Sequence, residues 1–469
     1  MMRSLFAGVS GLQNHQTRMD VVGNNISNVN TTGFKKGRVN FQDMLYQQLG
    51  GAARPTDEVG GVNPKEVGLG MTIASIDTIH TQGSLQSTGN LNDLAISGQG
   101  FFILAQGNST VYTRAGDFSL DRDGTMVNPS NGMKVQGWMA ENINGTTILE
   151  VSRDAGDIKI PVGGKDPAKA TTRVEFACNL DKRLPEIPEG TTDEAVLRAS
   201  RWNTSIKVYD SFGETHYMEA QFTRVPGTAN SWNVAVSVDP QAELATNTAI
   251  GLGEEPPAAG GAANFVVNFS NGGTIVNAVD AAGNISGGEN GQQVTMNVAF
   301  DVPNTDPNAD GTPVRQSFTL DLGNVGGAAR ALTQFTESSS SKPVTQDGYT
   351  MGYLETYKID RSGTITGVYS NGSNRVLAQI ALATFPNQGG LEKNGDTAFL
   401  VSNNSGAANV GASGVAGKGS IISGTLEMSN VDMAAEFVDM IVTQRGFQAN
   451  SRTIQTADQL LQEVLTLKR

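Results

Sequence analysis

The chain has 469 residues, a formal net charge of −13, 38% hydrophobic and 6% aromatic residues, 56 glycines and a single cysteine. The length is typical of two to four domains, and the acidic balance argues against general nucleic-acid binding. One cysteine excludes a disulfide framework and a cysteine-rich zinc site. Few aromatics with much glycine indicate many short strands joined by tight turns.

The first predicted element is an amphipathic helix from Ser4 to about Ile26. It should end in the run GNNISNVNTTGF (23–34), where Asn, Thr and Gly crowd together. Polar residues interrupt its apolar ones, and the chain has no run of about 18 apolar residues, so we predict neither a Sec-type signal nor a membrane span. The apolar residues recur at spacings of four and three and define a seam for assembly: Leu5, Val9, Leu12, Met19 and Ile26.

Between the two ends the sequence predicts β structure. Residues 89–138 alternate between apolar and polar, with a turn every eight to twelve residues. LDRDGTMVN (120–128) and IDRSGTITG (359–367) are similar to each other and indicate hairpins with glycine at the turn. Asp121 and Asp123 resemble the start of a calcium loop, but the further ligands and the bidentate glutamate are missing, which favours a plain turn.

Residues 171–345 form a second β-rich block. WNTSIKVYDSFGETHYMEAQFTRV (202–225) predicts a strand, a turn and a strand, and ESSSSKPV (337–344) is typical of a connector. The predicted fold is mainly β with α-helical termini, in a nested order. Residues 1–80 and 420–469 form a coiled-coil-like inner domain, 81–170 and 346–419 are two halves of a β-rich domain, and 171–345 are an inserted outer β domain.

The last predicted element is a helix from about Asp432 to Lys468, with Ser429 and Asn430 as candidate N-caps. Such a narrow apolar stripe suits coiled-coil contact. The pattern leaves two arrangements open: two helices that close onto one domain, or two ends that become ordered only when chains associate. Its seam for assembly comprises Met433, Phe437, Met440, Phe447, Ile454, Leu461 and Leu465.

Motifs for catalysis do not occur in the sequence. The three histidines, His15, His80 and His216, share no metal-ligand spacing, and H-E-x-x-H, P-loop and G-x-S-x-G patterns are missing. GQGFF (98–102) lacks the rest of a dinucleotide fingerprint. We therefore predict a structural protein with no cofactor and no metal ion, rather than an enzyme.

Three segments carry a specific resemblance. SLFAGVSGLQNHQTRMDVVGNNISNVNTTGFKKGRVNFQDML (4–45), QGSLQSTGNLNDLAISGQGFF (82–102) and the segment 424–469, which begins GTLEMSNVDM, closely resemble the signatures of bacterial flagellar axial proteins, the rod and hook family. Within that family, VYDSFGETH (208–216) and LTQF (332–335) are similar to the hook protein, as are 346–372 and 377–406. The long interval between the second and third signatures also favours the hook protein over the shorter rod proteins.

The resemblance implies a subunit that polymerises into the flagellar hook, the flexible joint that passes torque from motor and rod to filament. The implied partners are other copies of the chain in a helical homopolymer, the rod, the hook cap, the hook–filament junction proteins and the flagellar type III export apparatus. The implied location is the hook, reached without a cleaved signal peptide: periplasmic in a spirochaete, otherwise extracellular. A distal rod or other axial protein, and a secreted β-rich adhesin, stay open as alternatives.

The lone cysteine lies in RVEFACNL (173–180), where alternation predicts a strand with Cys178 on its apolar face. From the residues alone it is a small buried hydrophobe. The segment also resembles spirochaete hook proteins, whose neighbouring subunits are joined by lysinoalanine, a covalent Lys–Cys crosslink. That resemblance implies a self-catalysed bond from Cys178 to Lys165 of a neighbouring subunit, with Asn179 in the site. Lys169 and Lys182 are rival nucleophiles.

Overall fold

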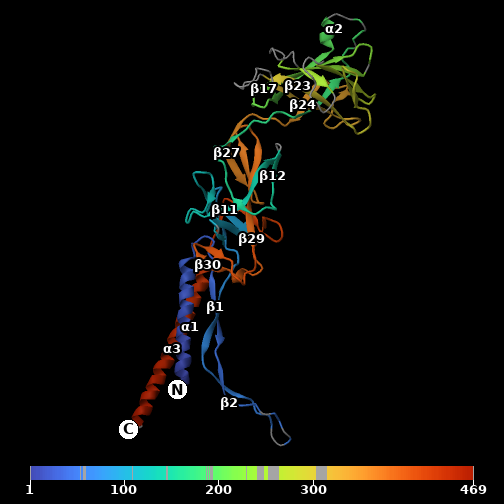
Figure 1. The fold of residues 1–469 in the computed structure, drawn as a ribbon. Coiled ribbons are helices and arrows are strands. Elements are labelled where there is room, and N and C mark those ends of the chain that lie inside the picture. Colours follow the sequence, from blue (N-terminus) through green and yellow to red (C-terminus); the bar gives the residue numbers. More distant parts are fainter. Residues whose placement is uncertain are drawn as a thin grey trace. The chain divides into compact units, whose positions relative to one another are not determined.

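The computed structural model describes residues 2–467 except 53, 56, 58–59, 108, 144–145, 186, 189, 191–193, 229, 240–247, 252–262 and 303–313. The chain is mainly β with a helix near each terminus, as the sequence predicts (Figure 1). It divides into two compact units. Unit 1 comprises Met1–Val162, Thr356–Val368 and Asn374–Arg469, and unit 2 comprises Gly163–Glu355 and Tyr369–Ser373. A separate inner domain of 1–80 with 420–469 stays a prediction, as do the other domain boundaries.

The two terminal helices begin and end within two residues of the predicted bounds, at α1 (Met2–Ser27) and α3 (Met433–Leu467). The predicted N-caps are wrong: the carboxylate of Asp432 accepts the N–H groups of Ala434 and Ala435 at 2.9 and 3.3 Å. Asn430 instead bonds to the chain after α1, accepting the N–H of Lys36 at 2.8 Å. Among the described residues, no helix combines the length and apolar character needed to cross a membrane.

Helices α1 and α3 pack antiparallel, so both chain termini lie at the same end of the pair (Figure 1). The two helices thus pair with each other within one chain, and ordering of these ends only on association stays a prediction. The backbones approach closely because glycines stand at the contact: an added Cβ at Gly11 would lie 2.5 Å from Nδ2 of Asn450. The contacts run in opposite directions along the two helices: Gly8–Ile454, Gly11–Asn450, His15–Gly446, Arg18–Asp439 and Asn25–Glu436.

The strands of unit 1 form one large sheet and several two-stranded ribbons. The ribbons are β1 (Gly37–Asp43) with β4 (Met71–Thr78), β2 (Tyr46–Gly50) with β3 (Lys65–Gly68), β5 (Leu85–Ser87) with β34 (Thr425–Glu427), and β6 (Leu94–Ser97) with β33 (Ser420–Ser423). The path of the large sheet is β27 (Gly352–Ile359), β28 (Thr364–Tyr369), β29 (Asn374–Thr384), β11 (Lys134–Ile143), β7 (Phe101–Gln106), β8 (Ser109–Thr113), β31 (Ala398–Leu400) and β30 (Glu392–Gly395).

Short strands extend this sheet, and β27 and β28 contribute residues to both units. The short strands are β9 (Ser119–Leu120), β10 (Met126–Val127), β12 (Thr146–Leu149), β13 (Gly156–Asp157) and β32 (Asn409–Ala412). A 3₁₀ helix, Gln388–Gly390, follows β29. Both predicted hairpins are confirmed, with the same backbone bonds: Asp121 N–H to Thr125 O and Gly124 N–H to Asp121 O in one, Asp360 N–H to Thr364 O and Gly363 N–H to Asp360 O in the other.

A buried cluster of three charges, here called the Glu427 clasp, ties distant segments of unit 1 together. Lys35 Nζ lies 2.5 Å from Glu427 Oε1, Arg114 Nη1 lies 3.3 Å from Oε2, and all three side chains are at most 1% exposed. The N–H of Gly83 also donates to Oε1 at 2.9 Å, and Lys35 donates to the carbonyl of Thr81 at 2.8 Å. The clasp thus joins the chain after α1, the chain after β8 and the end of β34, with each carboxylate oxygen bonded.

His80 is partly buried and packs against two core residues of unit 1, Phe101 and Phe399, with ring centres 5.7 and 5.2 Å away. Burial is the largest influence on it and lowers the pKa of His80 to about 4, and the positive charges of Lys35, Arg114 and Lys393 act in the same direction. The unfolded chain binds this proton below a pKa of about 6.5, whereas the folded chain binds it only near pH 4.

We therefore expect His80 to leave stability unaffected above pH 6.5 and to reduce it as the pH falls from 6.5 to about 4. The expected loss is on the order of 2 kcal/mol. Denaturant titrations of the wild type and of His80→Leu at pH 7.5 and 4.5 check this, because leucine does not titrate. The wild type should lose more stability than the variant between the two pH values. Equal losses would contradict the assignment.

Unit 2 is built from two sheets that share one hydrophobic core. One sheet has the order β16 (Arg201–Tyr209), β17 (Thr215–Arg224), β18 (Ser231–Val238), β20 (Asn264–Phe269), β21 (Ile275–Asp280) and β22 (Ile285–Gly287). The other has the order β19 (Ala249–Gly251), β23 (Gln293–Val302), β24 (Val314–Asn324), β15 (Arg173–Asp181) and β25 (Thr333–Phe335), with β26 (Ser340–Gln346) also on β15. Strict alternation of buried and partly exposed residues along β18 reflects this sandwich.

Two features of unit 2 bear on the sequence predictions. The strand–turn–strand expected in 202–225 is confirmed as β16 and β17. The connector expected at 337–344 is wrong, because most of it belongs to β26, which pairs antiparallel with β15 and places Ser341 opposite Cys178. A run of serines is not typical of a strand, and the strand forms here by pairing with β15, which is more than 150 residues away in the sequence. A short helix, α2 (Glu194–Ala199), and a two-residue strand, β14 (Lys165–Asp166), complete the unit.

Candidate assembly surface and crosslink residues

The predicted seam of α1 lies beside the α1–α3 contact rather than at its centre. Leu5, Leu12, Met19 and Ile26 are partly buried, and Val9 is 52% exposed. The residues that meet α3 are smaller or polar and stand one position away along the helix, as Gly11 does beside Leu12. The heptad spacing of apolar residues predicts contacts between apolar side chains only. It therefore does not predict a helix contact made through glycine, as at Gly8 and Gly11.

The predicted seam of α3 divides in the same way. Met440, Ile454 and Leu461 are partly buried, whereas Met433, Phe437, Phe447 and Leu465 are exposed. Three further exposed apolar residues, which the heptad count missed, lie on the first turns of the helix. We define the α3 patch as the five exposed side chains Met433, Phe437, Val438, Ile441 and Val442, which are 45–60% exposed. Contiguous exposed apolar surface of this kind is typical of a protein contact site.

Cys178 lies on β15 with its side chain in the core of unit 2. It is 6% exposed, and Phe176 and Leu180 on the same face are also buried, so the predicted apolar face is confirmed. Burial raises the pKa of the Cys178 thiol well above its usual value. The thiol is therefore neutral at physiological pH in the single chain.

Asn179, the next residue, anchors the segment that carries β25. Its Oδ1 accepts the N–H of Phe335 at 2.9 Å, and its Nδ2 donates to the carbonyl of Glu337 at 3.1 Å. The hydroxyl of Thr333 lies 3.4 Å from both Asn179 Oδ1 and the backbone carbonyl of Cys178. Thr333 is thus a polar group at the cysteine's own peptide that sequence reasoning missed, because it lies in a different strand.

The three lysines have different surroundings. Lys165 is exposed on β14, opposite Tyr353 of β27, with Nζ 5.9 Å from the centre of that ring. Lys169 Nζ lies 3.0 Å from Asp347. Burial acts to raise the pKa of Asp347, but hydrogen bonds from the Thr172 hydroxyl and from backbone N–H groups lower it to about 2.

Lys182 is exposed just after β15. Lys165 and Cys178 lie in different sheets, and within the described part of the chain no contact joins them. A bond between these two residues therefore requires a second subunit or a rearrangement.

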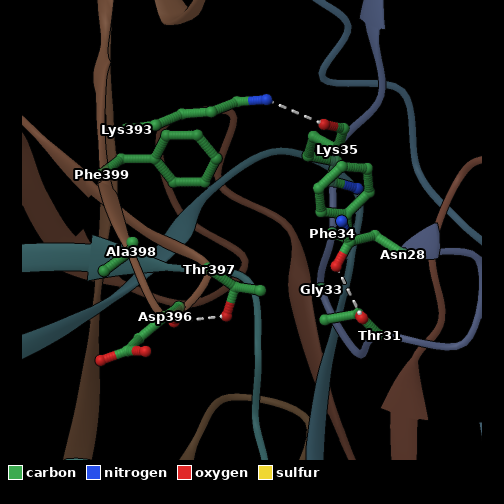
Figure 2. A pocket seen from close by; sticks show the side chains of 11 residues that line it. Asn28, Thr31, Gly33, Phe34, Lys35, Lys393, Asp396, Thr397, Ala398 and Phe399 are labelled. Carbon is green, nitrogen blue, oxygen red and sulfur yellow. Dashed lines mark hydrogen bonds between the residues drawn. The ribbon is translucent and has the colours of Figure 1, made fainter. Parts of the chain in front are cut away.

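A hollow of about 250 Å³ in unit 1 is the other candidate site (Figure 2). It lies between the turn after α1 and the β30–β31 hairpin, where Lys393 donates to the carbonyl of Lys35 at 3.2 Å. Burial lowers the pKa of Lys393, and its ammonium lies 5.3 Å from the centre of the Phe34 ring. Its described lining offers one carboxylate, no histidine and no thiol, so it resembles neither a metal site nor a general acid–base pair.

Comparison with known proteins finds flagellar rod and hook proteins along the whole chain. Family models match residues 5–35 (flagella basal body rod protein), 95–172 (flagellar hook protein FlgE/F/G D1 domain), 179–349 (flagellar basal body protein FlaE D2 domain) and 422–467 (flagellar basal body rod FlgEFG protein C-terminal). The chain is 56% identical to the flagellar hook protein FlgE of Treponema pallidum and 51% identical to that of Borreliella burgdorferi, each over 100% of both chains.

A solved structure supports the fold alone. The crystal structure of Helicobacter pylori flagellar hook protein FlgE2 matches with a TM-score of 0.50 and 14% identity, covering 73% of this chain and 100% of that one.

Terminal helices that close on each other, rod-type signatures at both ends and β-rich units between them define a flagellar axial protein. The sequence identity of 56% and 51% to hook proteins over the whole chain then favours a hook protein over the rod and adhesin alternatives. The chain belongs to the flagellar hook protein FlgE family and is a structural subunit of the hook.

Proposed function

We propose that assembled hook subunits become covalently joined by lysinoalanine between Cys178 of one subunit and Lys165 of its neighbour. The observation that carries the proposal is a lone, buried, neutral thiol whose own carbonyl is approached by the Thr333 hydroxyl. Similarity to two spirochaete hook proteins over the whole chain supports it further.

The reaction has two steps and needs no oxidant. A base removes the Cα proton of Cys178, the Cβ–Sγ bond breaks, and the sulfur leaves as hydrosulfide, so that the residue becomes dehydroalanine. The neutral amine of Lys165 then adds to Cβ, and a proton returns to Cα. Each crosslink therefore forms one C–N bond and releases one hydrogen sulfide.

The surroundings of Cys178 favour elimination over nucleophilic attack by sulfur. A thiolate is the form that attacks disulfides and alkylating reagents, and burial disfavours it here. A neutral thiol is the better leaving group, because it departs with a single negative charge rather than two. The first step places negative charge on the carbonyl oxygen of Cys178, where the Thr333 hydroxyl would act as a hydrogen-bond donor.

Asn179 acts in this proposal as a positioning residue. Its amide is committed to Phe335 and Glu337, so it holds the chain that carries Thr333 rather than donating to the reacting carbonyl itself. Lys165 is preferred over Lys169 because the Lys169 amine is held by Asp347 at 3.0 Å, whereas the exposed Lys165 side chain is available to a neighbouring subunit. Cys178 is only 6% exposed in the single chain. The reaction therefore requires assembly to open or repack the surroundings of Cys178.

A reducing, boiled denaturing gel of assembled protein tests the proposal, together with measurement of released sulfide. Wild type should give a high-mass ladder and one sulfide per crosslink. Cys178→Ala and Lys165→Ala should both run as monomer, while Lys169→Ala and Lys182→Ala keep the ladder. Thr333→Val should slow crosslinking without preventing assembly. A wild-type monomer band from a fully assembled sample would show that the subunits are joined without covalent bonds.

The finer cellular assignments rest on family membership. We propose that the chain leaves the cell through the flagellar type III apparatus, contacts the rod, the hook cap and the hook–filament junction proteins, and works in the periplasm. The spirochaete source of the two similar hook proteins supports the periplasmic location. Localisation of a tagged subunit in export mutants tests the route.

A further inference from the structure

Three side chains around the turn between β16 and β17 converge on one point of unit 2. Their potential ligand atoms, from Asp210, Glu214 and His216, all lie within 4.8 Å of one another. Asp210 is fully buried and His216 is 5% exposed, while Glu214 reaches solvent. Neither Asp210 Oδ2 nor His216 Nε2 has a hydrogen-bond partner, although the two atoms face each other at 3.6 Å.

The rest of the structure fixes both groups in this arrangement. His216 Nδ1 lies 2.5 Å from the carboxylate of Asp239, which itself accepts the N–H of Tyr217 at 2.7 Å. A carboxylate only accepts, so the proton of a neutral imidazole is on Nδ1, and Nε2 turns a lone pair toward Asp210. Asp210 Oδ1 is held by the N–H groups of Phe212 and Glu214 at 2.9 and 2.7 Å, which leaves Oδ2 for the imidazole side.

Two buried electron-rich atoms that face each other are unfavourable unless a proton or a metal ion lies between them. A proton on Nε2 would draw the pair to a hydrogen-bond distance of about 2.7–3.2 Å, shorter than the observed 3.6 Å. Two ligands of a tetrahedral zinc ion, each about 2.1 Å from the metal, lie about 3.4 Å apart. The separation of Oδ2 and Nε2 therefore fits a shared metal ion better than a shared proton.

We propose that Asp210, Glu214 and His216 bind one divalent transition-metal ion, with Asp239 orienting the imidazole. One nitrogen and two carboxylate ligands suit Zn²⁺ or a similar ion, whereas Mg²⁺ and Ca²⁺ prefer oxygen ligands alone. A carboxylate on the second ring nitrogen is the usual support of a metal-bound histidine. The Phe300 ring, 5.4 Å from the imidazole, supplies an apolar wall. Such an ion would fasten the end of β16 to the start of β17.

The test uses the full-length, untagged monomer, stripped with a chelator and titrated with Zn²⁺ by calorimetry and thermal unfolding. We expect one ion per chain and a rise in melting temperature of about 5 °C at saturating Zn²⁺, with no comparable effect of Mg²⁺. Glu214→Gln is the informative variant, because this exposed side chain is dispensable for folding: its zinc affinity should fall at least tenfold while the metal-free melting temperature is unchanged.

His216→Gln should abolish the titration, and Glu219→Gln provides the matched control, since Glu219 is an exposed carboxylate on the same strand. Its affinity should equal that of the wild type. A wild type that binds no Zn²⁺, or Glu214→Gln and His216→Gln variants that bind it as tightly as the wild type, would overturn the proposal. Both outcomes are independent of the crosslink, which uses none of these residues.

Discussion

Replacing Glu427 with alanine is expected to lower the free energy of unfolding of unit 1 by about 3–5 kcal/mol. The substitution removes a carboxylate that pairs with both Lys35 and Arg114, and it leaves the two cations buried at 0% and 1% side-chain exposure. Burial already lowers the pKa of both cations, an effect that Glu427 opposes. Without it, the N–H of Gly83 also loses its acceptor.

Hydrogen exchange of the core strands of unit 1 under native conditions measures this effect. Glu427→Gln separates the effect of charge from that of packing. It keeps the shape of the side chain and part of the hydrogen bonding, so it should lower the free energy of unfolding less than Glu427→Ala does. Glu141→Ala, which removes an exposed partner of Arg153, should cost under about 1 kcal/mol. If Glu427→Ala is as mild as Glu141→Ala, the clasp contributes no more than a surface pair.

The sequence predicted those parts of the fold that depend on neighbouring residues. Alternation along 173–180 placed Cys178 in the core, and the glycine at position 124 marked a hairpin turn. The clasp could not be found in this way, since Lys35, Arg114 and Glu427 are far apart and each resembles an ordinary surface charge in the sequence. They are brought together only when strands from both ends of the chain pair.

The same limit applies to the sites. Asp210 and His216 are six residues apart, a spacing that matches no familiar metal motif. The residue that orients the imidazole, Asp239, directly follows a third strand, β18. Asn179 is predicted only through a resemblance, and its partners Phe335 and Glu337 lie more than 150 residues away in the sequence, where no local pattern points to them. Tertiary pairing, rather than any local pattern, determines what these polar groups do.

The α3 patch leads to the second large effect: Phe437→Asp combined with Ile441→Asp is expected to raise the critical concentration for polymerisation about a hundredfold and leave the folded monomer intact. Both side chains are about half exposed in the single chain, at 47% and 49%, so their loss should change monomer stability by about 0.5 kcal/mol or less. Because about half of each side chain is already buried, covering the rest in a subunit contact is worth about 0.7–1.5 kcal/mol for each residue. Aspartate at these positions loses the free energy of apolar burial and adds the free-energy cost of burying a carboxylate.

A loss of about 3 kcal/mol per contact raises the critical concentration for assembly roughly a hundredfold. Sedimentation of purified protein over a range of concentrations gives that value directly, and thermal unfolding of the unassembled fraction reports on the fold. The matched control, Phe437→Leu with Ile441→Leu, keeps an apolar surface at both positions and should assemble close to the wild-type concentration. Equal assembly by the aspartate and leucine variants would mean that the patch faces solvent in the hook and that subunits associate through other surfaces. Loss of assembly in both would show that shape, more than apolar burial, governs the contact.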